Sequence, residues 1–176
     1  YGFGQSMDHN LIVVDGKSQE RIRGHLRHFE SREEADEVVM DAEIDPGVVH
    51  RRAVYYERSR FFVIHDRVVS DQSHDYSLRM HFDGVATCED DRVIYRAPGG
   101  AGLLLVTSAP VRLEDTETVV YSDEDGLSSR PINRAVIDVR ADSADFTSVL
   151  IPFKGEAPDL EVAMEMKEGG MSVEVR

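Results

Sequence analysis

The sequence is poor in cysteine and in long apolar runs. Cys88 is the single cysteine among 176 residues, which excludes an internal disulfide and any cysteine-rich zinc site. No apolar run approaches the roughly 20 residues that a membrane-spanning helix requires. The sequence also shows no basic segment followed by an apolar one, which is the pattern of a signal peptide. The chain begins at Tyr1 and not at methionine, which predicts a processed or trimmed piece of a longer protein.

Positive charge is also scarce, since 20 Lys and Arg stand against 34 Asp and Glu, for a net charge of −14. A nucleic-acid-binding surface needs the opposite sign, because it must neutralise phosphates. An anionic membrane surface is disfavoured for the same reason. We therefore expect neither nucleic acid nor a membrane among the partners of this protein.

What the sequence does contain is a series of short apolar segments separated by turn residues. Segments spaced by roughly 8–12 residues, without long helical periodicity, predict an all-β, two-layer antiparallel β-sandwich. Residues 1–176 contain no internal repeat and are predicted to form a single domain, long enough to bury a core. The predicted strands are 11–14, 49–57, 60–69, 74–82, 92–96, 102–108, 134–139, 146–153, 160–166 and 171–175, with a hairpin loop at 167–170.

Two segments carry more detailed predictions. In segment 74–82 the even-numbered residues, which are His74 and four apolar or aromatic residues, are predicted to share one face, with the odd-numbered residues on the other. Segment 31–40 permits two interpretations. Ser31 and Glu34 have the spacing of a helix capping box, whereas the alternation that continues from Val38 to Ile44 favours a strand, which we expect.

Six short motifs occur in an order that resembles a known family. They are HNLIVVDGKSQ at 9–19, VMDA at 39–42, HRR at 50–52, FVIHDRV at 62–68, LRMHF at 78–82 and FTSVLIP at 146–152. Each motif alone is common, but in this order they resemble the C-terminal β-sandwich domain of heparinase II/III-like polysaccharide lyases. The resemblance covers about residues 5–153, which is most of the chain.

The resemblance implies a two-part enzyme, in which an N-terminal α/α toroid and the sandwich enclose the substrate cleft. Such lyases cleave uronic-acid-containing polysaccharides by β-elimination, and the family's tyrosine and its carboxylate-neutralising asparagine or histidine lie on the toroid. This sequence contains no candidate toroid. We therefore expect the chain to supply only the sandwich side of the cleft, to be inactive alone, and to act in the periplasm or outside the cell on an acidic polysaccharide.

By the same resemblance, His9 is the candidate catalytic residue. The unperturbed pKa of imidazole lies near neutral pH, so a histidine can accept a proton or, when protonated, face a uronate. The position of His9 just before a predicted strand fits a loop that faces the missing toroid. The alternative is that His9 only donates a hydrogen bond to a neighbouring loop.

The resemblance also implies a zinc site, because several relatives hold zinc with two histidines and an aspartate. The matching positions are His9, Asp41 and His81, whose nitrogen and oxygen atoms are suitable zinc ligands. Asp41 and His81 are each predicted on the side of their strand opposite to the apolar residues. A saturated zinc ligand cannot also be an open catalytic group, so the two roles of His9 compete. Unrelated surface histidines are the alternative.

Other polar groups receive structural interpretations. His25 and His28 are expected to be solvated, and His65 is expected to be a hydrogen-bonded core histidine because its strand is strongly apolar. The sequence contains no G-x-S-x-G element, so no serine nucleophile of that type is predicted.

Ion pairs and aromatic residues complete the predicted interior. Asp66 and Arg67 are expected to form a buried structural pair with Arg51 or Arg52. The aromatic residues expected in the core are Tyr55, Tyr56, Phe61 and Phe62.

A stand-alone carbohydrate-binding or structural sandwich module is the alternative function. The negative net charge argues against binding a polyanionic sugar unless arginines gather locally, for instance Arg21, Arg23 and Arg27. Binding of a glycan by the isolated chain would favour this alternative.

Overall fold

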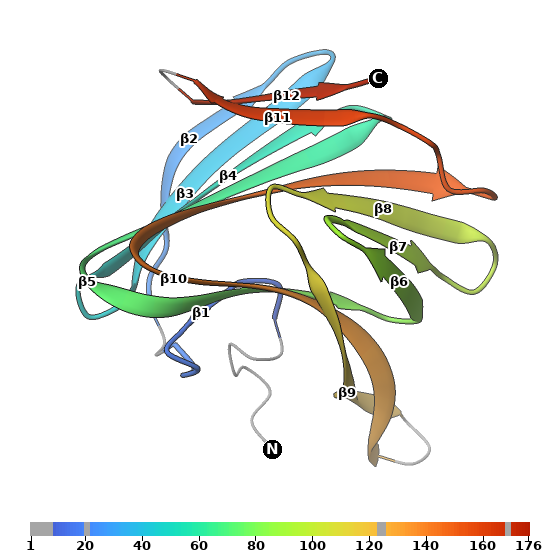
Figure 1. Ribbon diagram of the computed structural model, residues 1–176, viewed down its shortest axis with the longest axis horizontal. Helices are drawn as coiled ribbons and strands as arrows, with labels where there is room; N and C mark the ends of the chain where they lie inside the picture. Colours follow the sequence, from blue (N-terminus) through green and yellow to red (C-terminus); the bar gives the residue numbers. More distant parts are fainter. Residues whose placement is uncertain (1–8, 20–21, 123–125, 168–169) are drawn as a thin grey trace.

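The computed structural model describes residues 9–19, 22–122, 126–167 and 170–176 (Figure 1). These residues contain no helix, and therefore none that is long and apolar enough to cross a bilayer. The predicted all-β class is confirmed. The strands are β1 Ile12–Val14, β2 His25–Ser31, β3 Ala35–Asp45, β4 Val48–Glu57, β5 Phe61–Phe82, β6 Val85–Glu89, β7 Arg92–Arg96, β8 Ala101–Thr107, β9 Arg112–Ser122, β10 Gly126–Lys154, β11 Val162–Lys167 and β12 Gly170–Val175.

The sandwich arises because β5 and β10 bend and contribute to both layers (Figure 1). The first part of β5 pairs with β4 and the second part pairs with β1. β10 runs antiparallel to both parts, with a bulge between Ala141 and Ser143 at the bend. The large layer thus has the order β2-β3-β4-β5-β10-β8-β7-β6, and the small layer has the order β1-β5-β10-β9.

The main core lies between these two layers. Tyr76, Leu78 and Met80 from the small layer pack in one cluster with Val68 and Phe146 from the large layer. All five side chains are buried, which confirms the alternation predicted for segment 74–82. Each large apolar side chain removed from water in this way contributes roughly 1.5–3 kcal/mol.

A second apolar cluster lies on the outer face of the large layer. Phe61 and Val149 belong to it, and Val162 and Met164 of the β11–β12 hairpin pack against it. The pair of Lys167 with Gly170 ends the register of this hairpin, as predicted. Residues 168 and 169 of the predicted loop lie outside the described residues.

The strand predictions were right in kind but divided the chain too finely. Predicted strands 60–69 and 74–82 are both parts of β5, and 134–139 and 146–153 are both parts of β10. Segment 35–45 is strand β3, so a helix at 31–40 would have been wrong. Strands β2, β6 and β9 were missed. In β2 six of the seven residues are exposed, which leaves no alternation to detect.

The aromatic predictions were partly correct. Phe61 is 7% exposed and belongs to the outer cluster. Tyr56 and Phe62 are half-buried and stack with ring centroids 4.2 Å apart. Tyr55 is 37% exposed, so its prediction as a core residue was wrong. Successive residues of a strand point to opposite faces, so Tyr55 and Tyr56 cannot share one side.

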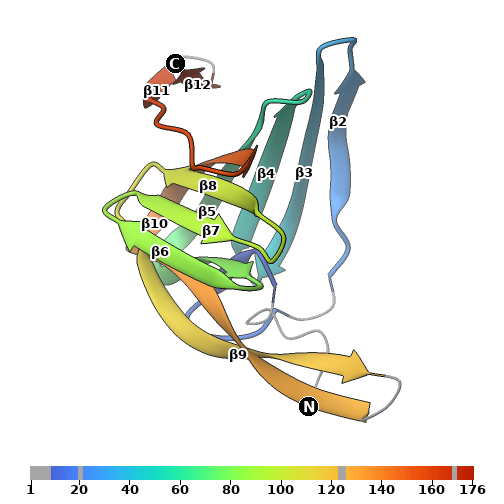
Figure 2. The same ribbon diagram turned by 90° about the vertical axis from the view of Figure 1, so that its right-hand side faces the viewer.

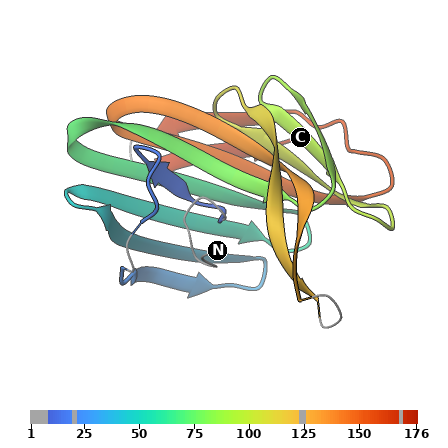
Figure 3. The same ribbon diagram turned by 90° about the horizontal axis from the view of Figure 1, so that it is seen from below.

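The large layer extends beyond the small layer at its β2 edge (Figures 2 and 3). Leu26 of β2 is in register with Met40 of β3 and, through it, with Arg52 of β4, which places these side chains on the face that turns toward the small layer. Phe29 lies on the same face. Leu26 and Phe29 are each 65% exposed and Met40 is 40% exposed. We call these three residues the overhang.

Candidate functional site

Residues 9–19 fold as a local unit at the edge of the small layer. Asp15 and Gly16 have φ angles of 49° and 67°, as a type I′ turn requires, and the Lys17 amide donates to the Val14 carbonyl at 2.9 Å. The Gln19 side-chain amide donates to the Ile12 carbonyl at 2.9 Å. The histidine–asparagine pair, the turn and the glutamine of the 9–19 motif therefore belong to one structural element.

The turn of this unit is fixed to β5. Asp15 Oδ1 accepts from the Asp75 amide at 3.0 Å, and Asp15 Oδ2 lies 2.9 Å from His74 Nδ1. The hydrogen bond from His74 is the main reason that the pKa of Asp15 lies below its ordinary value. The end of β1 away from His9 is therefore held by charged and backbone contacts.

His9 lies at the other end of β1 and is exposed to solvent. Its carbonyl accepts from the Leu11 amide at 3.0 Å, and the Leu11 carbonyl accepts from the Arg79 amide at 3.0 Å. An exposed imidazole at a sheet margin is accessible to a ligand or to a neighbouring domain, which is the placement that a catalytic role requires.

Asn10, the neighbour of His9, contacts both layers. Its side-chain oxygen accepts from the His81 amide of β5 at 2.8 Å and lies 3.1 Å from His81 Nδ1. Its carbonyl accepts from Arg52 Nη1 of β4 at 2.9 Å. The segment that carries His9 is thus bridged to the large layer by one arginine.

Arg52 is itself held by a buried carboxylate. Asp66 is completely buried and accepts from Arg52 Nε at 2.6 Å and from Arg52 Nη2 at 3.0 Å. His50 Nε2 lies 2.6 Å from Asp66 Oδ1. Burial by itself raises the pKa of Asp66, but the hydrogen bonds from His50 and Arg52 outweigh it and hold the pKa below its ordinary value.

The prediction of a buried pair with Asp66 is confirmed for Arg52. Arg67 is exposed and is not part of this pair, and Arg51 points to the other face, where it lies 3.6 Å from Asp41. The sequence prediction missed His50. The only sequence feature that could have predicted the role of His50 is its spacing from Arg52, which places both residues on one face of a strand.

The three predicted zinc ligands do not converge. Asp41 lies on the outer face of the large layer, where its carboxylate accepts from Arg27 at 2.8 Å. His81 lies on the outer face of the small layer, in register with Arg134. Side chains on the outer faces of two opposed layers point away from each other, so His9, Asp41 and His81 do not fit one zinc ion. No catalytic step is therefore assigned to a metal.

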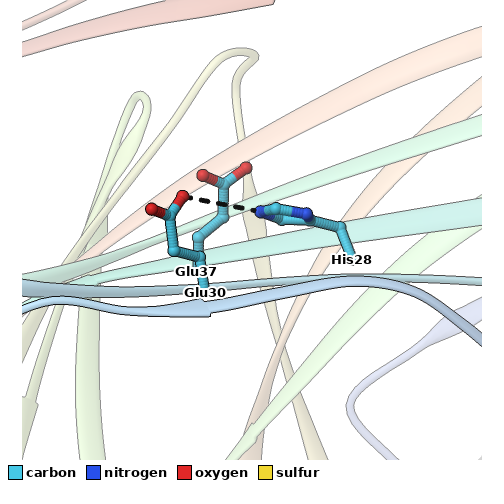
Figure 4. Close-up of side chains that lie close together, drawn as sticks. All are labelled: His28, Glu30 and Glu37. Atoms are coloured by element: carbon cyan, nitrogen blue, oxygen red, sulfur yellow. Dashed lines mark ion pairs between the residues drawn. The ribbon is translucent and has the colours of Figure 1, made fainter.

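A different group of metal-ligand types occurs on β2 and β3 (Figure 4). Within the described ranges, His28, Glu30 and Glu37 are the one such cluster whose ligand atoms all lie within 4.8 Å of one another. Glu30 already accepts two hydrogen bonds from Arg32, at 2.7 and 2.5 Å. This cluster lies on the outer face of the large layer, away from the segment that carries His9.

The remaining candidates have local partners. His65 is half-buried, with Nδ1 3.0 Å from the Thr147 hydroxyl, which agrees with its prediction as a satisfied histidine. His25 and His28 are exposed, as expected. Of the arginines considered as a patch, Arg21 lies outside the described residues. Arg27 is paired with Asp41.

A depression of about 370 Å³ lies near the turn end of β1 and is lined by Gly16 and by residues of β5, β9 and β10. Two of its three arginines bond carboxylates of the same lining: Arg112 bonds Asp138 at 2.7 Å and Arg140 bonds Asp75 at 2.9 Å. The third, Arg79, donates to the Ser77 hydroxyl at 3.4 Å. Because two of the three positive charges are neutralised, the depression attracts an anion weakly, and the margin at His9 is the better candidate site.

Comparison with known proteins identifies relatives. The family described as Heparinase II/III-like, C-terminal, matches residues 2–170. A heparan sulfate lyase from Pedobacter heparinus has a TM-score of 0.80 at 15% identity, over 97% of this chain and 29% of that chain. A heparinase III has a TM-score of 0.83 at 17% identity, again over 97% of this chain and 29% of that chain. A search of curated proteins gave no match.

These structural likenesses, at 15–17% identity, show a shared fold. The chain spans 29% of the length of these solved structures, so in them the sandwich is one part of a longer protein.

Proposed function

The chain belongs to the heparinase II/III-like C-terminal family, and from this membership we propose that it forms the sandwich side of a two-part polysaccharide lyase. The other part is an N-terminal α/α toroid that would complete the substrate cleft. The proposed substrate is a polysaccharide containing uronic acid, and the proposed reaction is β-elimination. The observation that carries the proposal is the exposed His9 at the sandwich margin, within a domain that spans 29% of its structural relatives.

In the proposed reaction a base removes the proton from the carbon beside the uronate carboxylate. The electron pair of that bond forms a carbon–carbon double bond, the glycosidic bond breaks, and the departing oxygen receives a proton. His9 is suited to this chemistry because imidazole exchanges protons near neutral pH, and because protonated imidazole attracts a carboxylate. The toroid would supply the tyrosine and the group that neutralises the carboxylate.

The overhang supports the presence of a covering partner. Leu26, Phe29 and Met40 form an apolar strip that a soluble domain seldom leaves uncovered without a function. The strip lies on the same face of the large layer as Arg52, which contacts the segment of His9. A toroid that covers this strip would therefore also approach His9.

The net charge of the chain also favours a two-part site. A chain with a net charge of −14 repels a polyanionic substrate over the range in which charges are unscreened. The cations that attract the polysaccharide would therefore come mainly from the toroid. This reasoning predicts that the isolated sandwich is inactive.

The test compares the isolated chain with a protein that also carries the toroid. Formation of the unsaturated uronate product is followed by its ultraviolet absorbance, with heparin, heparan sulfate, alginate and ulvan as substrates. We expect turnover only when the toroid is present. In that protein His9→Ala should lower kcat by about 100- to 10,000-fold. His28→Ala, which changes an exposed histidine on the outer face, is the matched control.

Two results would contradict the proposal. Turnover by the isolated chain would show that the sandwich is not merely one side of a site. Tight binding of a glycan by the isolated chain, without turnover when the toroid is added, would favour the stand-alone binding module.

A further inference from the structure

The segment that carries His9 lies beyond the regular ladder of its sheet. The pairing of β1 with β5 runs only from Ile12 to Val14. Among residues 9–11, the one backbone bond to β5 in the described part of the chain is that of the Arg79 amide with the Leu11 carbonyl. Within these described residues, His9 and Asn10 therefore have no repeated backbone bonds to β5 of the kind that fix a strand. Side-chain contacts must place them if the imidazole is to have a defined position.

Such contacts come from a charged pair in the interior. Asp66 binds Arg52 through two guanidinium nitrogens, Nε and Nη2, so the plane of the guanidinium is set by the carboxylate. This leaves Nη1, which donates to the carbonyl of Asn10 at 2.9 Å. Arg52 is only 20% exposed, so its conformation is also limited by its surroundings.

The two layers hold Asn10 from different directions. The His81 amide of the small layer binds its side chain, and Arg52 of the large layer binds its backbone carbonyl. Bonds to both the side chain and the carbonyl restrict the rotation of Asn10 and the direction of the preceding peptide. The preceding peptide belongs to His9.

We propose that Arg52, oriented by Asp66, is a positioning residue that fixes the imidazole of His9 toward the cleft. This inference rests on the proposed function of His9. Neither Arg52 nor Asp66 needs to contact substrate. Their effect would come from geometry, because a displacement of about 1 Å in a reacting group can cost about 100-fold in rate.

Arg51 provides a matched control for Arg52. The two arginines are adjacent on β4 but point to opposite faces, and Arg51 lies 3.6 Å from Asp41 instead of contacting Asn10. Arg52→Gln removes the bond to Asn10 and keeps a long polar side chain. Arg51→Gln makes the same chemical change on the outer face.

The first experiment measures amide hydrogen exchange in the 176-residue chain. With Arg52→Gln we expect the His81 amide, which donates to Asn10, to lose protection, while the amides that pair β3 with β4 keep theirs. Arg51→Gln should leave the His81 amide as in the wild type. Unchanged protection in Arg52→Gln would overturn the proposal, and so would a loss of protection throughout the sheet.

The second experiment measures kinetics in the protein that also carries the toroid. Arg52→Gln should lower kcat by about 10- to 100-fold with little change in KM, as expected for a lost alignment. Arg52→Lys should restore part of kcat, because lysine can donate to the Asn10 carbonyl without the fork to Asp66. Equal kcat in Arg52→Gln and Arg51→Gln would overturn the proposal.

The two experiments separate this inference from the proposed function. If the wild-type protein with its toroid shows no turnover, the proposed function fails, and hydrogen exchange still decides whether Arg52 orders the segment. If the wild type is active and His9→Ala is inactive, but Arg52→Gln behaves as the wild type, only the positioning role fails.

Discussion

The inner and outer faces of the large layer each hold an aspartate bound to arginine, in very different surroundings. Asp66 on the inner face is completely buried, and its arginine is 20% exposed. The Asp41 side chain on the outer face is 9% exposed, but the side chains of Arg27 and Arg51, which pair with it, are 55% and 62% exposed. Water can replace the partners of Asp41 if they move away, whereas it cannot reach Asp66.

This difference separates two uses of the same chemical pair. An exposed ion pair exchanges protein contacts for water contacts at little cost. A buried carboxylate that loses one partner keeps its full desolvation penalty, so the fold must keep that partner in place. The inner pair can therefore transmit a fixed geometry to Asn10, which a solvated pair cannot do.

The largest expected effect comes from removing the buried charge. Asp66→Asn leaves Arg52 without its carboxylate and should lower the free energy of unfolding by about 3–5 kcal/mol. Urea denaturation followed by circular dichroism measures this change, with an unchanged m-value as the check that the unfolded state is the same. A decrease in the free energy of unfolding of less than about 1 kcal/mol would show that the pair contributes no more than a solvent-exposed ion pair does.

The same carboxylate should make stability depend on acid pH. The folded pKa of Asp66 lies below its unfolded value, so its contribution to stability is complete above the unfolded pKa and is lost as the pH falls through the folded pKa. The stability difference between the wild type and Asp66→Asn should therefore be constant above about pH 5 and shrink below about pH 4. Urea titrations across this range test it, and a difference that grows in acid would contradict it.

The outer pair should give a smaller effect that salt abolishes. Asp41→Asn should shift the urea midpoint much less than Asp66→Asn. At about 1 M salt, where the screening length is about 3 Å, the midpoint of Asp41→Asn should match the wild type. The deficit of Asp66→Asn should persist, because the ions do not reach a buried pair. Equal salt sensitivity of the two variants would remove the distinction between the faces.

The smallest effect on stability is expected at the overhang. Phe29→Ser should change the free energy of unfolding by no more than about 0.5 kcal/mol, because the ring is already exposed in the isolated chain. It should nevertheless weaken association with a separately produced toroid, measured by analytical ultracentrifugation. Val85→Ser, at an exposed apolar residue of β6, is the control. Equal association of both variants would place the partner elsewhere.

The sequence alone was sufficient for local features. The alternation in 74–82 predicted which residues of β5 face the core, and the Asp15–Gly16 pair predicted its turn. The edge strand β2 could not be predicted, because its exposed side chains follow no apolar pattern. The exposed position of His9, by contrast, was predicted from its place just before a strand.

The contacts around the candidate site required the tertiary structure. Alternation correctly placed Asp41 and His81 on the side of their strands opposite to the apolar neighbours. It could not predict in which layer each strand lies, and the two residues are separated because their strands belong to opposed layers. The contact of Arg52 with Asn10 joins residues 42 positions apart, across two layers. Strand periodicity is a local property of the chain, whereas a contact between layers depends on where β5 and β10 bend. The sequence therefore determined the all-β class, most of the strands and the turn, and the bend decided which polar groups meet.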